Sequence, residues 1–424
     1  MRLKVERSQL RGTVEIPASK SHVVRALAIA TLAKGNSEIH YPLISSDSLA
    51  CVGACRALGA EISLENEACW QVKGVGGQVR VPQNVIDVKN SGTTCRITMG
   101  MAALAPGFSV FTGDEQTRRR PMQPLLDALN NLGVRAFTTK GDGRLPAVIE
   151  GRIQGGRTEV EGLTSQYLTS LLISCPLAEG DTELVVKDLH ERPYVEMTLS
   201  WLDEQEIHYE SQGLESFQVL GGQNYHAFQK RVPADFSSAT FFLCAAAITD
   251  AEVILRGLDM EDSQGDKKVV TLLQEMGADI QLQGSTIKVR GGRELIGQEL
   301  DLNDIPDALP AMAVVGCCAR GVTVLRNVPQ ARIKETDRIT TMCRELSKLG
   351  ADIQELPDGL VIRQSTLLGG KLHGHGDHRV VMSLAIAGLV ASGETEVDTA
   401  EATEVTFPNF VELMEGLGVR IRKV

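Results

Sequence analysis

The feature that most constrains the fold is a short segment that recurs along the chain. Each copy has a helix-like stretch, a Leu-Gly or Met-Gly turn and a strand-like stretch, and a degenerate copy, "WLDEQEIHYE", falls near Glu206. Glycine after the last helical turn is the usual end of a helix, so each copy predicts a helix, a left-handed stop and a strand. The clear copies are "CRALGAEI" at Gly59, "LNNLGVRAF" at Gly133, "LQEMGADIQL" at Gly277, "LSKLGADIQEL" at Gly350 and "MEGLGVRIRKV" at Gly418.

The spacing of these copies indicates how many structural units the chain contains. Successive copies are about 70 residues apart, and the 424 residues divided by six also give about 70. A repeat of this length is a unit of several strands and helices rather than one rung of a solenoid. Because the chain is too long for one ordinary core, we expect two domains of about three units each.

Composition excludes several classes of protein. The 43% hydrophobic and 23% charged residues are typical of a soluble globular protein, and no apolar run approaches the roughly 18 residues of a membrane span. The first residues, "MRLKVERSQLRG", lack the apolar core of a signal peptide. The nine cysteines lie largely in apolar segments such as "FFLCAAA", which predicts free thiols and a cytoplasmic location.

The net charge of −11 and the absence of a basic stripe argue against a nucleic-acid partner. A local cluster of cations can still attract a small anion within a cleft, whatever the net charge of the whole protein. We therefore expect small-molecule ligands, no membrane or nucleic-acid partner, and a monomer.

Several predicted strand-to-helix junctions combine cationic side chains with the unpaired N–H groups of a helix N-terminus. Such ends favour anions, and guanidinium groups match phosphate and carboxylate. A helix cap or a solvated charge run would explain any one junction, but their recurrence favours anion binding. The junctions are "PASKSHVVRA" (Lys20, Ser21, Arg25), "KNSGTTCRI" (Asn90, Gly92, Thr93, Arg96), "TRRRPMQ" (Arg118, Arg119, Arg120), "GLTSQYL" (Thr164, Ser165, Gln166), "ARIKETDRI" (Lys334, Glu335, Arg338) and "HGHGDHRVV" (Asp377, His378, Arg379).

Carboxylates stand among these cations. Asp301, Asp304 and Asp307 lie in "DLNDIPDALPAMA", Asp235 lies beside two serines, and Glu335 lies within "ARIKETDRI". Structural ion pairs would account for each of them. The alternative is proton transfer by carboxylates whose pKa is tuned by neighbouring charges.

Other chemistries have weaker signals. His373, His375 and His378 could form a metal cluster, but the neighbouring acid, arginine and glycines favour an anion-binding loop. The adjacent Cys317 and Cys318 lie in an apolar run and lack the spacing of metal ligands. No phosphate-loop motif and no dinucleotide-binding fingerprint is present, so nucleotide-dependent chemistry is not indicated.

In this order and nearly end to end, the motifs of the chain resemble the 5-enolpyruvylshikimate-3-phosphate synthase family. The most specific are "NDIPDA", "KETDR" and "DHR", and the rest are "PASKSHVVRA", "NSGTTCRI", "RRRPMQPLLDAL", "TSQYLTSLL", "RPYVEMT", "ADFSSATFFLCAAA" and "TFPNF". The resemblance implies a mixed α/β fold, a two-domain inside-out α/β barrel of six βαβαββ repeats. The implied domains are residues 19–232 and residues 1–18 with 233–424, and the implied active site lies in the cleft between them.

The implied activity is that of a transferase of the shikimate pathway, which leads to chorismate and the aromatic amino acids. It moves the enolpyruvyl group of phosphoenolpyruvate to the 5-hydroxyl of shikimate 3-phosphate and releases phosphate. The reaction proceeds by addition and elimination through a tetrahedral intermediate, with no metal or organic cofactor. The resemblance also implies sensitivity to glyphosate, which binds in the phosphoenolpyruvate pocket beside Gly92.

The resemblance assigns a role to each candidate residue. Asp307 accepts the proton of the 5-hydroxyl, Glu335 protonates the methylene carbon, and Lys20 assists. Shikimate 3-phosphate is bound by Lys20, Ser21, Arg25, Thr164, Ser165, Gln166, Tyr194, Asp307 and Lys334. Phosphoenolpyruvate is bound by Lys20, Gly92, Arg120, Gln166, Arg338, His378 and Arg379.

Three positions depart from the pattern of the family. Glu191 stands where many members have a serine next to the phosphate, so either its side chain points away or the phosphate pocket is rearranged. Val405 replaces a lysine that some members use to bind phosphoenolpyruvate, and Ile97 replaces a proline of many glyphosate-sensitive members. These changes bear on affinity and inhibition more than on the type of reaction.

Two alternatives stay open. The sister transferase that acts on UDP-N-acetylglucosamine has the same architecture, but it places a cysteine in the loop that here reads "GDEQTRRRP", and it lacks "KETDR". A non-catalytic paralogue kept for ligand binding is the other alternative.

Overall fold

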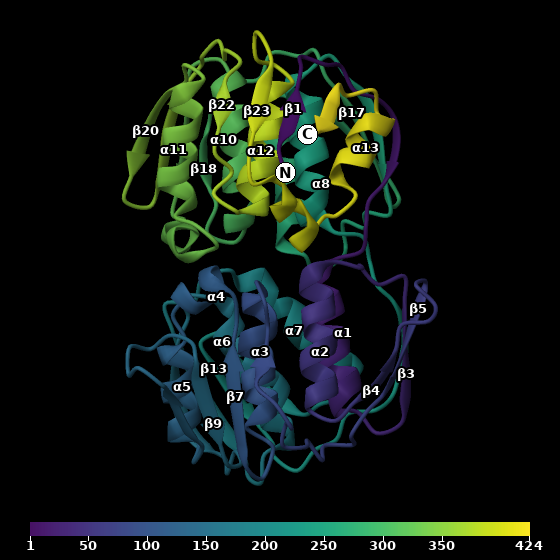
Figure 1. The fold of residues 1–424 in the computed structure, drawn as a ribbon, viewed down its shortest axis with the longest axis vertical. Helices are drawn as coiled ribbons and strands as arrows, with labels where there is room; N and C mark the ends of the chain where they lie inside the picture. Colours follow the sequence, from purple (N-terminus) through teal and green to yellow (C-terminus); the bar gives the residue numbers. More distant parts are fainter. The chain divides into compact units, whose positions relative to one another are not determined.

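The computed structural model describes residues 1–424, and the chain forms two compact units. Unit 1 consists of Met1–Ser19 and Pro233–Val424, and unit 2 consists of Lys20–Val232. Both are built from short strands and helices in alternation (Figure 1). None of the helices combines the length and the apolar character needed to cross a bilayer.

Six four-stranded sheets share one topology. In the sheet of β6 (Ile86–Asp87), β7 (Phe108–Thr112), β8 (Arg135–Thr138) and β9 (Ala147–Glu150), β6 pairs parallel with β7, and β9 pairs antiparallel with both β7 and β8. Helices lie between β6 and β7 and between β7 and β8, which gives the order βαβαββ. The predicted mixed α/β fold with βαβαββ repeats is therefore confirmed.

The remaining strands follow the same scheme in both units. Unit 2 contains two further sheets. One consists of β10 (Gly156–Glu161), β11 (Thr182–Lys187), β13 (Ser216–Val219) and β12 (Tyr209–Gln212). The other consists of β14 (Gln229–Arg231), β3 (Asn36–His40), β5 (Cys69–Lys73) and β4 (Glu61–Ser63). Unit 1 contains the sheets β2 (Arg11–Glu15), β15 (Glu252–Arg256), β17 (Thr286–Arg290), β16 (Asp279–Gln283); β18 (Glu299–Asp301), β19 (Val322–Arg326), β21 (Gly359–Arg363), β20 (Asp352–Leu356); and β22 (Lys371–Leu372), β23 (Thr395–Val397), β1 (Leu3–Val5), β24 (Ile421–Lys423).

The chain passes twice between the units, and a strand belongs to the unit left behind at each passage. Strand β2 directly precedes the first helix of unit 2 but pairs parallel with β15 of unit 1. Strand β14 directly precedes the second half of unit 1 but pairs parallel with β3 of unit 2. Strand β1 pairs with both β23 and β24, so the N-terminal strand completes the last repeat.

The first helix of each repeat is buried along nearly its whole length, and the second is buried on one face. In unit 2 the first helices are α1 (Lys20–Leu32), α3 (Gly92–Ala102) and α6 (Ser165–Ser174), and in unit 1 they are α8 (Phe236–Ile248), α10 (Leu309–Cys318) and α12 (His378–Gly388). The other helices are α2 (Ser46–Ala57), α4 (Glu115–Arg119), α5 (Gln123–Asn131), α7 (Arg192–Glu204), α9 (Lys268–Glu275), α11 (Arg338–Lys348) and α13 (Phe410–Gly416).

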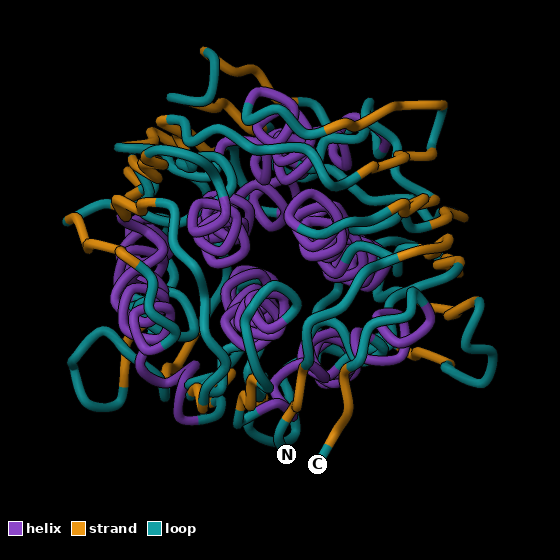
Figure 2. The backbone as a smooth tube through the Cα atoms, turned by 90° about the horizontal axis from the view of Figure 1, so that it is seen from above, coloured by secondary structure: helices purple, strands orange, loops and turns teal.

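The first helices form the core of each unit. Helix α3 packs against α1 and α6, while α8, α10 and α12 pack against one another. The strands lie outside the helices (Figure 2), and their side chains alternate between buried and exposed, as in β19, where Thr323 and Leu325 are buried. Sheets with one covered face and a helical interior match the inside-out arrangement that the resemblance implied.

The recurring glycine segments have the predicted local structure. Gly59 follows the C-terminal residues of α2 with a φ of +112°, and the corresponding residue of the degenerate copy, Glu206, follows α7 with a φ of +56°. A residue other than glycine pays a steric penalty of roughly 1 kcal/mol in this region. The chain therefore keeps the left-handed stop even where glycine has been replaced.

Candidate active site

Most candidate residues of unit 2 lie at or near the N-termini of α1, α3 and α6, where backbone N–H groups lack helical acceptors. Arg120 follows α4, and Tyr194 lies in the first turn of α7. Lys20 is the first residue of α1, and its Nζ lies 3.2 Å from Oδ2 of the buried Asp47. Gly92 is the first residue of α3, after Ser91, which accepts from the N–H of Thr94. The sequence thus places a lysine, a glycine and hydroxyl groups at three neighbouring helix ends.

The N-terminus of α6 already holds a carboxylate. Thr164 is its N-cap residue, and Oγ1 of Thr164 donates to Oε2 of Glu191 at 3.1 Å. The N–H and the Oγ of Ser165 donate to the same oxygen at 3.2 and 2.9 Å. Of the two possibilities left by the sequence for Glu191, the structure selects the second, because the side chain points into this group of donors.

Arg25 connects three helices of unit 2. Its Nε donates to Thr198 on α7, Nη1 donates to the carbonyl of Ser21, and Nη2 donates to the carbonyl of Tyr194 at 2.7 Å and to Thr169 on α6 at 3.4 Å. Burial lowers the pKa of Arg25 to about 10, against the opposing effect of Tyr194. Most of its N–H groups already have acceptors within unit 2, so Arg25 positions Ser21 and Tyr194 as well as offering charge.

Two further arginines, Arg96 and Arg120, surround the start of α3. Nη1 of Arg96 donates to Oε1 of Gln166 at 2.6 Å, and its guanidinium stacks 5.2 Å from the centre of the Tyr167 ring. A methyl group on Gly92 would lie 2.4 Å from Nη1 of Arg120 and 3.0 Å from Nη1 of Arg96. The guanidinium of Arg120 therefore occupies the space that the missing side chain leaves.

Arg96 was absent from the ligand-binding residues assigned by the resemblance, although its junction was recognised. Its spacing carried a signal, since it lies one helical turn after Gly92 and so faces the same end of α3. The contact with Gln166 of α6, which links two repeats, could not be read from the sequence.

The candidate residues of unit 1 gather around Arg338, the first residue of α11, whose side chain is 1% exposed. Its guanidinium donates to Asp307 at 2.6 Å, to Glu335 at 2.6 Å and to Asp377 at 2.8 and 3.3 Å. Burial alone would lower the pKa of Arg338, but Asp377, Glu335 and Asp307 together raise it above its usual value. Three carboxylates from separate segments are thus held by one cation.

Asp307 lies just before α10, and it is also 2.9 Å from Nη2 of Arg379. Burial on its own would raise the pKa of Asp307, but Arg379, Arg338 and Lys334 outweigh burial and Glu335 and hold the pKa well below its usual range. Asp307 is therefore ionised at neutral pH and able to accept a proton.

Helix α12 presents its first two residues, His378 and Arg379, beside these carboxylates. Asp377 caps the helix by accepting from the N–H of Arg379 at 2.9 Å. Burial lowers the pKa of His378 to about 3, against the effect of Glu335 and Asp377, so its imidazole is neutral. Neither ring nitrogen of His378 has a hydrogen-bond partner within the protein.

The other two histidines of this loop contact different carboxylates. Nδ1 of His373 lies 2.6 Å from Asp398, and Nε2 of His375 lies 3.1 Å from Glu345. A separate group of possible metal ligands, absent from the sequence-based candidates, is formed by Glu38, His40 and Cys69 on β3 and β5.

The segment "ARIKETDRI" divides its charges between two environments. Arg332 donates to Asp337 at 2.7 Å and to the carbonyls of Leu356 and Pro357, which anchors the segment to the β20–β21 turn. Lys334, Glu335 and Arg338 act together with Asp307 instead. Only part of this charge cluster belongs to the candidate site.

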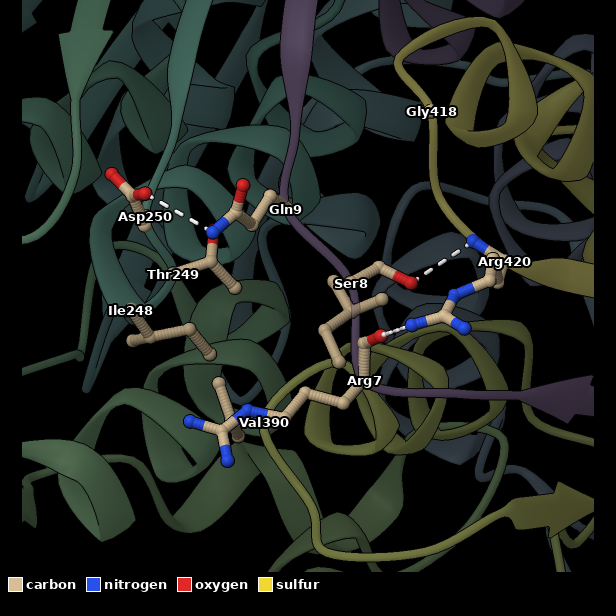
Figure 3. Close-up of a pocket in the computed structure, with 10 residues that line it drawn as sticks. Arg7, Ser8, Gln9, Ile248, Thr249, Asp250, Val390, Gly418 and Arg420 are labelled. Carbon is tan, nitrogen blue, oxygen red and sulfur yellow. Dashed lines mark hydrogen bonds between the residues drawn. The ribbon is translucent and has the colours of Figure 1, made fainter.

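A surface pocket lies elsewhere in unit 1 (Figure 3). It has a volume of about 510 Å³ and is lined by residues at the C-terminal ends of α8 and α12, including Ile248 and Val390. Ser8 and Gln9 cross it, with Gln9 donating to Asp250 and the N–H of Arg420 donating to Ser8. The candidate residues His378 and Arg379 lie at the opposite, N-terminal end of α12, so the pocket is separate from them.

Helix N-termini with cations or carboxylates beside them recur in both units, and they are the features expected of a protein that binds small anions and transfers protons. A sequence model of the family described as EPSP synthase (3-phosphoshikimate 1-carboxyvinyltransferase) matches residues 5–414. This chain belongs to that family. The resemblance found in the sequence is therefore confirmed.

Individual relatives match over their whole length. The chain is 56% identical to the 3-phosphoshikimate 1-carboxyvinyltransferase of Acetivibrio thermocellus over 99% of both chains, and 53% identical to that of Ruminiclostridium cellulolyticum over 100% of both. A solved structure of the EPSP synthase from Acinetobacter baumannii superimposes with a TM-score of 0.83, at 28% identity and with 99% of both chains covered. These matches support the shikimate enzyme rather than the alternative acceptor UDP-N-acetylglucosamine.

Proposed function

We propose that the residue groups of the two units together carry out the reaction of the family, the transfer of the enolpyruvyl group of phosphoenolpyruvate to the 5-hydroxyl of shikimate 3-phosphate. The observation that best supports this assignment is the cluster of Asp307, Glu335, Arg338 and Arg379. It combines two carboxylates for proton transfer with two arginines suited to an anionic substrate.

In the addition step, Asp307 takes the proton of the 5-hydroxyl while that oxygen attacks C2 of phosphoenolpyruvate. Glu335, assisted by Lys20, supplies a proton to the methylene carbon, which gives a tetrahedral intermediate. Loss of a proton from the new methyl group and of phosphate from C2 then yields the enolpyruvyl ether. Protons and leaving group balance without a metal or an organic cofactor.

The charges around Asp307 suggest how substrate binding activates it. Arg338 and Arg379 hold its pKa low in the ligand-free protein, which makes it a weak base. A phosphoenolpyruvate anion bound to these arginines adds negative charge beside Asp307 and so raises its pKa. We propose that the base gains strength only when the second substrate is present.

The residues of unit 2 act in binding and positioning. Thr164, Ser165 and Gln166 bind shikimate 3-phosphate together with Lys334 of unit 1, and Arg25 with Ser21 and Tyr194 orients its ring and carboxylate. Lys20 serves both substrates. Gly92 and Arg120 bind phosphoenolpyruvate with Arg338, His378 and Arg379. Helix ends and guanidinium groups stabilise the charge that develops during the reaction.

Product analysis tests this assignment. The purified protein, incubated with phosphoenolpyruvate and shikimate 3-phosphate, is expected to release one phosphate for each enolpyruvyl ether detected by mass spectrometry. Phosphate release without the ether would show that the protein hydrolyses phosphoenolpyruvate instead.

We also propose that the protein is a cytoplasmic monomer. Its cysteines are all free, and six of the nine are buried, which suits a reducing compartment. Light scattering at several protein concentrations should give a mass close to 45.8 kDa, the mass of one chain. A mass near twice that value would contradict the monomer.

A further inference from the structure

Glu191 is a buried carboxylate at a binding site for an anion. The residue is only 2% exposed. Its Oε2 accepts hydrogen bonds from the hydroxyl of Thr164 and from both the N–H and the hydroxyl of Ser165. These donors belong to the N-terminus of α6, a helix of 10 residues. Glu191 therefore gives this helix end the same kind of partner that a phosphate oxygen would provide.

Glu191 contacts the N-terminus of α6 and does not cap α7, the helix that follows it in the chain. Glu191 precedes α7 with a φ of +57° and a ψ of +42°, a left-handed conformation that is uncommon for glutamate, and its side chain makes no capping hydrogen bond to α7. Helix α7 begins with Arg192 and Pro193, and proline suits a first helical turn. The start of α7 therefore does not depend on the carboxylate of Glu191.

We propose that Glu191 is an internal competitor of the substrate phosphate: its carboxylate occupies the phosphate-binding position at Thr164 and Ser165 and must leave before shikimate 3-phosphate can bind there. This inference rests on the proposed function. The three donors converge on one oxygen and cannot serve a carboxylate and a phosphate at once. A carboxylate and a phosphate that both contacted Thr164 and Ser165 would also repel each other strongly, because the site is buried.

The competition has a defined consequence for specificity. Displacing Glu191 lowers the affinity for any acceptor that carries a phosphate at this position. An acceptor without the phosphate leaves Glu191 in place, so its affinity is not lowered. Glu191 thus narrows the preference for shikimate 3-phosphate over shikimate, whereas the serine found at this position in many members of the family would not compete.

The test compares Glu191→Ser with Glu196→Ser, because Glu196 lies on the exposed face of the same helix and carries the same charge. Isothermal titration calorimetry measures the binding of shikimate 3-phosphate and of shikimate to each variant. Glu191→Ser is expected to bind shikimate 3-phosphate at least ~10-fold more tightly than the native protein, with unchanged affinity for shikimate. Glu196→Ser is expected to match the native protein for both ligands.

Unchanged or weaker binding of shikimate 3-phosphate to Glu191→Ser would overturn the inference, since it would make Glu191 a structural or supporting residue. Glu191→Gln keeps the volume and removes the charge, so it should also tighten binding, and it replaces the serine variant should that variant not fold. A native protein that neither binds nor converts shikimate 3-phosphate would instead refute the proposed function. The two failures are therefore distinguishable.

Discussion

At the scale of single residues, the candidate site depends on Arg338, whose one positive charge is shared by three carboxylates. One guanidinium contacts Asp307, Glu335 and Asp377, so each carboxylate is held by a donor that it shares with the other two. Such buried networks are sensitive to the loss of any one member, because the remaining charges stay buried without full compensation. The sequence placed these residues in separate motifs and could not show that one arginine connects them.

Gly92→Ala tests the space at the start of α3. The new methyl group would meet Nη1 of Arg120 at 2.4 Å and force this guanidinium to move. The obstacle is the end of a flexible side chain, so we expect the fold to survive and the KM for phosphoenolpyruvate to rise by ~10-fold or more. Steady-state kinetics measures the effect. Gly53→Ala is the control, since nothing lies within 4 Å of its added methyl group, and its KM should stay native.

His378 predicts how stability depends on pH. Its pKa is about 3 in the folded protein against a usual value of 6.5, so between these values the unfolded chain binds more protons. Stability must therefore fall as the pH decreases from about 6.5 towards 3, by up to ~1.4 kcal/mol per pH unit for this residue. Urea unfolding of His378→Gln between pH 6.5 and 4.5 should show a smaller pH dependence than the native protein.

The matched control for this measurement is His208→Gln, because His208 is exposed. Its pH dependence should equal that of the native protein. Asp307 has a shift of the same sign, but its usual value is 3.8, so it contributes mainly below that pH window. A pH dependence of His378→Gln equal to the native one would show that this imidazole is already protonated or solvated in the folded state.

At the scale of elements, the six repeats show which parts of the fold are encoded by residues close together in the sequence. Glycine or its substitute after each second helix predicted a helix, a stop and a strand, and the structure has this order in every repeat. Pairing between distant strands is not encoded in this way. The parallel pairs β2–β15 and β14–β3 join segments that are far apart in sequence, and only the family resemblance suggested where the chain crosses.

Glu206→Gly tests how much stability the protein loses by having a residue other than glycine at the left-handed stop of the degenerate copy. Glu206 holds a φ of +56°, which glycine adopts without steric penalty. The substitution is expected to stabilise the protein by about 0.5–1 kcal/mol, measured by urea unfolding. Glu196→Gly, inside α7, should instead destabilise it by about 1 kcal/mol. Destabilisation by Glu206→Gly would mean that the glutamate side chain contributes more than its backbone conformation costs.

At the scale of the whole molecule, the candidate residues are divided by task between the two units. The proposed acid and base, Glu335 and Asp307, belong to unit 1, and the hydroxyl donors Thr164 and Ser165 belong to unit 2. The residue types of both groups were predictable, because the motifs identify them. The direction of Glu191 was not, since it depends on the packing of α6 against the start of α7.

This division predicts two different kinds of defect. Glu335→Gln should lower kcat by 10²–10⁴, roughly the contribution of a general acid, and leave the affinity for shikimate 3-phosphate nearly native. In the Glu191→Ser background, where no carboxylate competes for the donor, Ser165→Ala removes one hydroxyl donor from the phosphate and should weaken that affinity by about 10-fold, with a smaller effect on kcat. Calorimetry and steady-state kinetics on both variants separate the effects. Loss of binding in Glu335→Gln would contradict the division.

The most direct test of the central claim is the choice of acceptor. Phosphate release from phosphoenolpyruvate is measured with the purified protein, first with shikimate 3-phosphate and then with UDP-N-acetylglucosamine. The proposed function predicts release with shikimate 3-phosphate alone. Release with UDP-N-acetylglucosamine, or with neither acceptor from a folded sample, would contradict it.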